Sequence, residues 1–291
     1  MPGRPPGGSQ NRAGERGAIP RTAPTVFRPP IPEPLVRPVR ACHPEAHVSL
    51  TGFQIDDRIH LDARRAAWLP LSRCLAVADL HLGEAWVRRA RGQLVPLGVV
   101  DTTVSRLRSL MEAYRPERVV LLGDIVHGAL PLEGIREAVG DLVALGHEGV
   151  RIHWCLGNHD RNLPRQLERW GWSVDTATRV ILPEAVLDHG DRPPEPWPAD
   201  PAAPGWHLHG HLHPALMLDD GVASRAKVPC FLIAQARPGR PARLVLPAFS
   251  EMAAGSVVDR RGVPQGLGPE DRFDSAVACL GPRLLRIPLE E

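Results

Sequence analysis

The side chains in this sequence with the clearest chemical potential are aspartates, histidines and an asparagine in short, mostly glycine-containing clusters. Carboxylate, amide and imidazole donors form a mixed oxygen and nitrogen set that suits Mn, Fe, Co, Zn or Ni better than Ca. The donors are too many for one four-coordinate ion, so they indicate two divalent cations about 3.5–4 Å apart that share one carboxylate. The clusters are Asp79-Leu80-His81, Gly123-Asp124, Gly157-Asn158-His159-Asp160, His189-Gly190 and Gly210-His211-Leu212-His213.

Three of these clusters lie at the ends of short apolar runs, which are Cys74–Asp79, Arg118–Asp124 and Ile152–Asn158. Near-continuous apolar runs of this length are typical of strands covered on both faces. Between the runs, apolar residues recur with helical spacing over 107–114 and 135–142, which predicts amphipathic helices. The alternation predicts an α/β fold with parallel strands. Ligands bind beyond the carboxyl ends of such strands, so we expect the clusters to meet there.

The second half of the chain has a different pattern. A proline-rich loop is expected over 190–206, and further strands are expected at Phe231–Ile233, Arg243–Leu246 and Leu284–Ile287. These strands predict a second sheet packed on the first.

Composition sets the domain organisation of the 291-residue chain. Residues 1–45 are rich in Pro, Gly and Arg and cannot bury enough apolar surface to offset their ordering entropy, so we expect a disordered extension before a domain over 46–291.

The net charge of +2 is too small to identify a partner. Five cysteines without a C-x-x-C pair do not predict a disulfide framework. The sequence shows neither a membrane-spanning stretch nor a signal peptide, so we expect a cytoplasmic protein.

Over residues 79–213, the five clusters resemble those of the calcineurin-like metallophosphoesterase superfamily, in the same order. A closer resemblance, over most of the chain after residue 45, is to the bacterial ligase-associated DNA damage response endonuclease branch. The sequence departs from that branch at Glu84, where a lysine is usual, and at Arg88, near a usual aromatic position. The closer resemblance is carried by Ala67-Trp68-Leu69-Pro70, Ala78-Asp79-Leu80-His81-Leu82-Gly83, Leu156-Gly157-Asn158-His159-Asp160-Arg161, Gly210-His211-Leu212-His213-Pro214 and Leu246-Pro247-Ala248-Phe249.

The superfamily resemblance implies a four-layer α/β/β/α sandwich with two divalent metal ions, manganese being favoured over Fe, Zn, Co or Ni. A metal-activated hydroxide would attack the phosphate ester. His159 would protonate the leaving group or stabilise charge on the phosphate, and Asp160 would orient the His159 ring. The implied ligands are Asp79, His81, Asp124 and His213 for the first ion, and Asp124, Asn158, His189 and His211 for the second.

Three other histidines and three arginines lie near these clusters in the sequence. His207 and His209 are interpreted as supporting or structural residues, and His127 could reach the site from the loop after Asp124 but is given no role. Three arginines, Arg88, Arg89 and Arg91, either bind phosphates that flank the scissile bond or form a solvated helix face.

The expected function is metal-dependent phosphodiester hydrolysis, with a DNA endonuclease linked to DNA repair as the branch implies. DNA and DNA-repair proteins are the expected partners, and no membrane is expected. One alternative is a phosphatase or pyrophosphatase that acts on a nucleotide or small metabolite. A non-catalytic scaffold in a repair assembly is the alternative of another class, and the intact metal-binding clusters count against it.

Overall fold

The computed structural model describes most of the chain from residue 47 onward, and all described elements belong to one unit, Arg40–Glu291. The expected extension over 1–45 and most of the proline-rich loop lie outside the described residues, and a single domain over 46–291 stays a prediction. The described residues are 47–49, 52–95, 99–128, 133–146, 149–192, 197, 204–219, 224–253, 255–259, 261–264 and 271–289.

The first sheet has seven strands in the order β2-β3-β4-β5-β6-β7-β8. Strands β5 to β8 are parallel, as the strand–helix alternation predicts, whereas β2 to β5 form an antiparallel meander that the sequence patterns did not indicate. The strands are β2 (Gly52–Gln54), β3 (His60–Asp62), β4 (Ala66–Leu69), β5 (Cys74–Ala78), β6 (Arg118–Leu122), β7 (Arg151–Cys155) and β8 (Asp175–Ala177).

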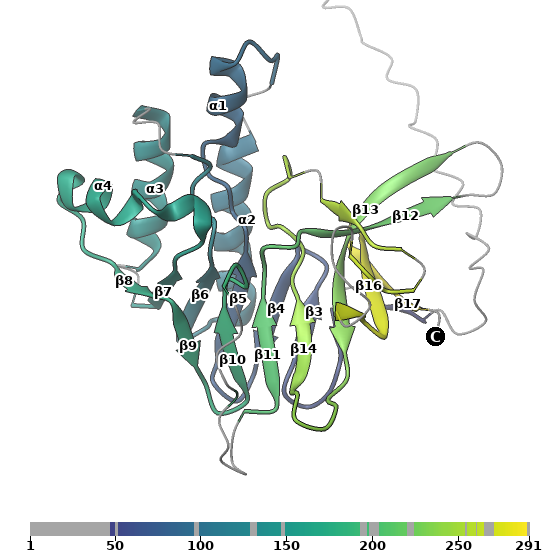
Figure 1. Cartoon of the computed structure of the whole chain (residues 1–291). Helices are drawn as coiled ribbons and strands as arrows, with labels where there is room; N and C mark the ends of the chain where they lie inside the picture. Colours follow the sequence, from purple (N-terminus) through teal and green to yellow (C-terminus); the bar gives the residue numbers. More distant parts are fainter. Residues whose placement is uncertain are drawn as a thin grey trace, which may run out of the picture. The chain divides into compact units, whose positions relative to one another are not determined.

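Helices cover one face of this sheet and gather beside β5 to β8 in Figure 1. The two predicted helices are confirmed, and their apolar residues such as Leu107 and Val139 pack against Val77 and Leu121. Alternate strand residues face the opposite way, which explains why the runs are apolar throughout. The helices are α1 (Glu84–Ala90), α2 (Val99–Tyr114), α3 (Glu133–Gly146) and α4 (Leu163–Trp170), with a 3₁₀ turn η1 (Asn158–Asp160).

The second sheet has ten strands, and its main order is β1-β17-β16-β13-β14-β11-β10-β9, with β12 and β15 paired beyond it. The three strands predicted in this half are confirmed within β13, β14 and β17. The strands are β1 (His47–Ser49), β9 (Arg179–Ile181), β10 (Ala185–Asp188), β11 (Trp206–His209), β12 (Pro214–Asp219), β13 (Arg225–Ala234), β14 (Ala242–Val245), β15 (Ser256–Val257), β16 (Ser275–Leu280) and β17 (Arg283–Pro288).

The two sheets pack face to face over a buried apolar core that includes Val120, Leu187 and Leu244. Cys74 and Cys155 belong to this core as small buried side chains, and burial raises the pKa of the Cys155 thiol to about 12. The α/β sandwich is therefore confirmed. The fourth layer, on the outer face of the second sheet, differs from the helical layer that was expected. The described residues that cover this face belong to strands and loops, as Val258 and Phe273 do.

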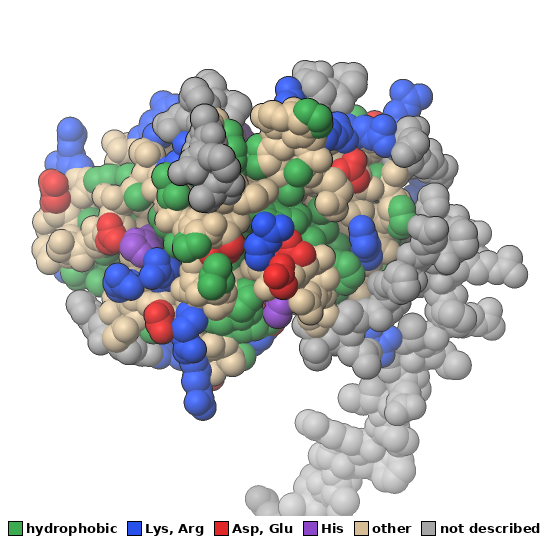
Figure 2. Space-filling model, turned by 90° about the horizontal axis from the view of Figure 1, so that it is seen from below, with side chains coloured by type: hydrophobic (Ala, Val, Ile, Leu, Met, Phe, Trp, Pro, Cys, Tyr) green, Lys and Arg blue, Asp and Glu red, His purple; other side chains and the backbone are tan. Residues whose placement is uncertain are grey.

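The described helices include none that is long and apolar enough to cross a membrane. On the face shown in Figure 2, basic side chains lie among acidic, polar and hydrophobic ones. This mixed surface agrees with the net charge of +2, so recognition of a charged partner must depend on local groups.

The core between the sheets gives a direct test of the fold. Leu244→Ala removes a side chain with 0% exposure and is expected to lower the free energy of unfolding by about 2–5 kcal/mol, because it leaves a cavity. Urea denaturation measures the change. Leu71→Ala is the matched control: Leu71 is 68% exposed, so the change should stay within about 0.5 kcal/mol. Equal losses in the two variants would contradict this packing.

Candidate metal centre

The loops that follow the strands place the predicted ligands with unusual backbone geometry. Eight non-glycine residues in the described chain have a positive φ, and five of them are predicted ligands. Left-handed backbone is uncommon outside glycine, although aspartate and histidine tolerate it better than most residues. Such strain costs about 1–3 kcal/mol per residue and persists only where the surroundings enforce it. The five residues are Asp79, His81, Asp124, His211 and His213.

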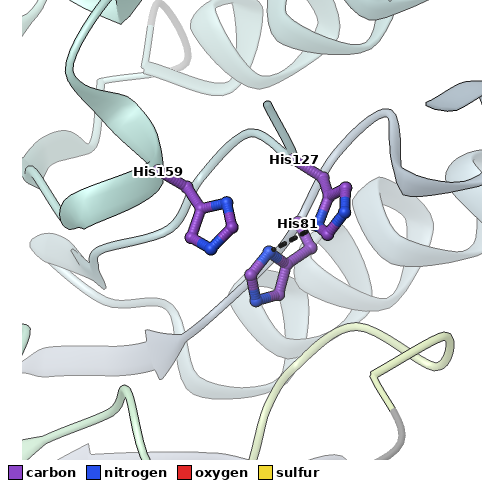
Figure 3. A group of neighbouring side chains, drawn as sticks. All are labelled: His81, His127 and His159. Carbon is purple, nitrogen blue, oxygen red and sulfur yellow. Dashed lines mark hydrogen bonds between the residues drawn. The ribbon is translucent and has the colours of Figure 1, made fainter. Parts of the chain in front are cut away.

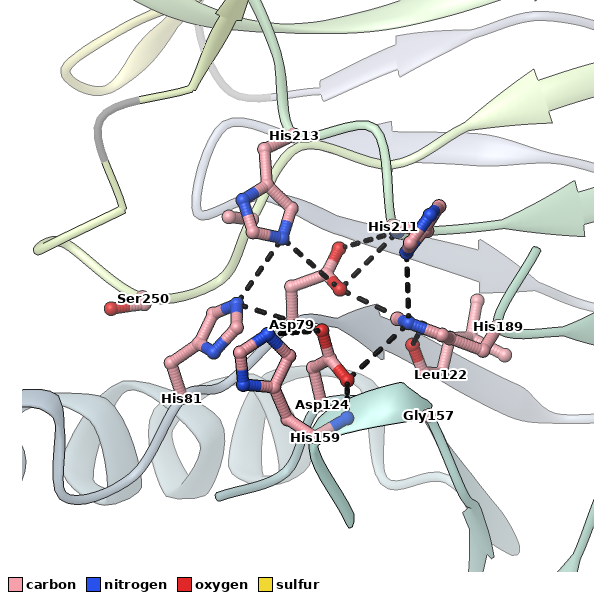
Figure 4. A network of polar contacts seen from close by, with 12 residues as sticks. Asp79, His81, Leu122, Asp124, Gly157, His159, His189, His211, His213 and Ser250 are labelled. Carbon is pink, nitrogen blue, oxygen red and sulfur yellow. Dashed lines mark hydrogen bonds and ion pairs between the residues drawn. The ribbon is translucent and has the colours of Figure 1, made fainter. Parts of the chain in front are cut away.

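A first group brings together one donor atom each from Asp79, His81, Asp124 and His213, all within 4.8 Å of one another. The Nε2 atom of His213 lies 3.3 Å from Oδ1 of Asp79 and 3.2 Å from Nε2 of His81. Figure 4 shows these side chains pointing toward one another from separate loops. This is the set that the resemblance implies for the first ion.

A second group forms around His189 and shares Asp124 with the first group. The Nε2 atom of His189 lies 3.2 Å from Oδ1 of Asn158, 3.4 Å from Oδ1 of Asp124 and 3.2 Å from Nδ1 of His211. The other ring nitrogen, Nδ1, lies 3.0 Å from the Leu122 carbonyl oxygen. A bond donated to that carbonyl orients the ring, so that Nε2 points at the group.

Backbone hydrogen bonds hold the carboxylates of Asp79 and Asp124 between loops. Asp79 accepts the His211 N–H at 2.9 Å, and Asp124 accepts the His159 N–H at 2.9 Å. The loops must approach these carboxylates closely. A Cβ at Gly157 would lie 2.4 Å from Oδ1 of Asp124, and one at Gly210 would lie 2.5 Å from Oδ2 of Asp79. These contacts explain why glycine precedes Asn158 and His211.

The electrostatics of the two groups suit cations. Burial alone would lower the pKa of His189, but the hydrogen bond to Asp124 and the negative charges of Asp79 and Asp124 raise it to about 9. Burial, reinforced by the charge of His213, lowers the pKa of His81 to about 3, which keeps this imidazole neutral. Two groups of mixed oxygen and nitrogen donors, sharing one carboxylate in a negative pocket, fit a pair of divalent metal ions.

A third group of imidazoles lies beside the first, formed by His81, His127 and His159 (Figure 3). The Nδ1 atoms of His127 and His81 are 3.3 Å apart, and the ring of His127 stacks on that of His159 with centroids 5.4 Å apart. His127 therefore contacts His81 on the side opposite its donor atom and restrains its ring. The position of His127 in the sequence, three residues after Asp124, indicated that it could reach the site.

Asp160 has surroundings that differ from the sequence-based expectation. Its fully buried carboxylate accepts backbone N–H groups from Ile125 and Val126 at 3.1 Å and from Gly157 at 2.9 Å. Its hydrogen bonds within the described chain do not include the His159 ring. Burial raises the pKa of Asp160 to about 6, although the three N–H bonds oppose the rise. Asp160 joins two loops of the site, and the expected orienting bond to His159 is not formed.

His207 and His209 lie outside the two ligand groups. The Nε2 atom of His207 lies 3.0 Å from Oδ2 of Asp188, and Nδ1 of the buried His209 lies 3.1 Å from the Gly210 carbonyl oxygen. Both contacts are made next to predicted ligands, His189 and His211, so these histidines are placed to support the loops that carry them.

The arginines of α1 and of the residue that follows it also differ in their surroundings. Arg88 donates to the buried Glu84 carboxylate at 2.6 Å and to the Met252 carbonyl oxygen at 3.2 Å. Arg89 donates to the Val95 carbonyl oxygen at 3.0 Å. Arg91 is exposed, and its charge is one of several that lower the pKa of His127, after burial as the main cause. Arg88 therefore fastens a loop, while Arg91 lies within electrostatic reach of the site.

The chain is similar to known proteins in fold and matches one family model. No curated protein matches the sequence. The crystal structure of the Pseudomonas putida nuclease MPE is similar in fold, with a TM-score of 0.55 and 22% identity, covering 79% of this chain and 97% of that one. The Aquifex aeolicus protein of unknown function AQ665 is more distant, with a TM-score of 0.32 and 17% identity over 48% of this chain and 78% of that one.

The family model for calcineurin-like phosphoesterases matches residues 72–229, more than half of the chain. This range contains every residue of the two ligand groups. The chain therefore belongs to the calcineurin-like phosphoesterase family and is a metal-dependent phosphoric ester hydrolase.

Proposed function

We propose that this protein is a two-metal phosphodiesterase that cleaves DNA, with manganese as the favoured metal. The observation that carries the proposal is the position of Asp124, whose carboxylate belongs to both ligand groups at once. We assign Asp79, His81, Asp124 and His213 to one ion and Asp124, Asn158, His189 and His211 to the other. A role in DNA repair, repair proteins as partners and a cytoplasmic location are parts of this proposal that rest on the sequence resemblance.

When bound, such a metal pair supplies Lewis acidity and an activated water for attack on phosphorus. The chain's own residues supply positioning and proton transfer. His159 is the candidate proton donor, because its Nε2 atom lies 3.9 Å from Oδ2 of Asp124 and its side chain is 38% exposed. The ring thus lies at the mouth of the site, where a leaving group could reach it. His127 stacks on this ring and limits its rotation.

The choice of DNA as substrate has two supports. The Pseudomonas putida protein with the similar fold is a nuclease. In addition, Arg91 offers an exposed guanidinium near His127, where it could bind a phosphate that flanks the scissile bond. A phosphatase that acts on a simple phosphomonoester would need no such flanking contact.

One experiment separates these activities. Metal-free protein is titrated with Mn²⁺ while the hydrolysis of bis-p-nitrophenyl phosphate and of p-nitrophenyl phosphate is measured. A phosphodiesterase hydrolyses the diester in proportion to bound metal. Preference for the monoester would favour a phosphatase instead, and hydrolysis of neither compound, with single-stranded DNA also left intact, would favour a non-catalytic scaffold.

The shared carboxylate gives the sharpest prediction. Asp124→Ala is expected to remove activity and most metal binding, because the carboxylate joins both ligand groups. Elemental analysis of the purified variant measures the bound metal. Asp57→Ala, at a side chain that is 92% exposed, is the matched control and should keep both ions and full activity. Two tightly bound equivalents in the Asp124 variant would rule out the shared role.

His159→Gln tests the proton donor. The variant is expected to keep both metal ions and to lose diester turnover by roughly 10²–10⁴-fold, the usual effect of a positioned acid. The loss should be smaller for p-nitrophenyl esters than for alkyl esters, since a good leaving group needs less protonation. Loss of a metal ion in this variant would instead make His159 a ligand, together with His81 and His127. Equal loss on both kinds of ester would contradict the acid role.

Arg88 in α1 and Arg91 directly after it are expected to differ in their effects on stability and DNA binding. Arg88→Ala should lower the free energy of unfolding by about 1–3 kcal/mol, because it leaves the Glu84 carboxylate, which is 6% exposed, without its cation. Arg91→Ala should leave stability within about 0.5 kcal/mol. It should instead weaken binding of single-stranded DNA and lower the slope of log K against log salt by about 0.7. Urea denaturation and fluorescence anisotropy measure the two effects, and the reverse pattern would contradict the assignment.

A further inference from the structure

A cavity of about 260 Å³ adjoins the metal centre on the side of His213. Its walls come from the start of β12, from β13 and from the loop that follows β14. The same loop is bound to the metal-centre backbone, because the Ser250 N–H donates to the Asp79 carbonyl oxygen at 3.1 Å. A group bound in the cavity would therefore lie next to a group bound at the metal centre, separated from it by the His213 side chain.

The charges that line this cavity are mainly positive. Lys227, the only lysine in the sequence, lines the cavity from β13. Arg65, which lies much earlier in the chain, also lines it. Nη1 of Arg65 donates to the Ala248 and Ser250 carbonyl oxygens, which fixes the guanidinium. The carboxylate among the lining residues, Glu251, is paired with Arg106 at 2.8 Å. The cavity therefore presents a net positive charge to an incoming group.

The remaining residues that line the cavity have small or apolar side chains. Gly255 closes one side, and a Cβ at this position would lie 2.9 Å from both the Ala215 Cβ and the His213 carbonyl oxygen. The same position would be 3.9 Å from Cε of Lys227, so the lysine stem extends along this wall. Small and apolar side chains beside a lysine suit a ligand that has an apolar part and an anionic end. The apolar lining residues are Pro214, Ala215, Pro229, Ala248, Met252 and Ala253.

We propose that this cavity binds the nucleotide unit next to the scissile phosphate, with Lys227 binding the phosphate of that unit. The inference rests on the proposed phosphodiesterase function and adds a substrate-binding subsite to it. A nucleotide provides the faces of its base and sugar for the walls and an anion for Lys227. The cavity is smaller than the roughly 300–1,000 Å³ of pockets that enclose a whole ligand, which suits one unit of a longer chain.

The test compares thymidine dinucleotides that differ by one phosphate: TpT, pTpT and TpTp. Cleavage of the internal bond is followed by chromatography in the presence of Mn²⁺, and kcat/KM for each phosphorylated form is divided by that for TpT in the same protein. The wild-type ratio is expected to be roughly three to ten for the form whose added phosphate reaches Lys227. Lys227→Ala should bring the ratio to about one, and Lys227→Arg should restore most of it.

Arg225→Ala is the matched control, because Arg225 lies on the same strand and is paired with Asp219 outside the cavity. Its ratio should equal that of the wild type. A wild-type ratio of one for both phosphorylated forms would overturn the subsite while leaving the phosphodiesterase proposal intact. An equal fall in the Lys227 and Arg225 variants would also overturn it, since general attraction would then explain the effect.

A binding measurement decides the matter even if no dinucleotide is cleaved. Fluorescence anisotropy follows a labelled single-stranded oligonucleotide on metal-free protein as salt is varied. Lys227→Ala should lower the slope of log K against log salt by about 0.7, and Arg225→Ala should leave it unchanged. Equal slopes in the wild type and the Lys227 variant would contradict the subsite. Failure to hydrolyse bis-p-nitrophenyl phosphate or DNA would instead contradict the phosphodiesterase proposal.

Discussion

Burying a carboxylate is costly unless hydrogen bonds or cations meet its charge, and this structure buries three of them where the strands end. Asp160 meets this requirement through backbone N–H groups of two loops, and Asp79 through an N–H of a third. Burial alone would raise the pKa of Asp124. The surrounding histidines and the hydrogen bond from the His159 N–H outweigh burial and hold this pKa well below the usual range. Each carboxylate therefore joins loops from different strands, and the geometry of the site depends on these links.

Sequence patterns predicted the parts of the fold that repeat a simple rule. Apolar runs covered on both faces identified the parallel strands, and helical spacing identified α2 and α3. The predicted ligands lie close together because the carboxyl ends of parallel strands lie at the same edge of a sheet. The meander β2–β4 was missed because its strands have only three or four residues, too few to show a period.

Other features depend on contacts between distant residues, which local patterns do not carry. Asp160 follows His159 directly, yet its carboxylate turns toward Ile125 and Val126. Arg88 reaches Met252, which lies 164 residues later in the chain. The covering of the second sheet by strands and loops likewise depends on tertiary packing. Residue identity therefore predicted which side chains lie close together more reliably than it predicted their hydrogen-bond partners.

The left-handed backbone at five predicted ligands limits how this protein could evolve toward higher stability. Glycine would relax the backbone at such a position, but glycine has no side chain to serve as a donor. Other side chains would keep the strain and lose the chemistry. Substitutions at the metal centre therefore cannot raise stability without loss of a ligand. Gains in stability must come from positions far from it, such as helix caps or the core between the sheets.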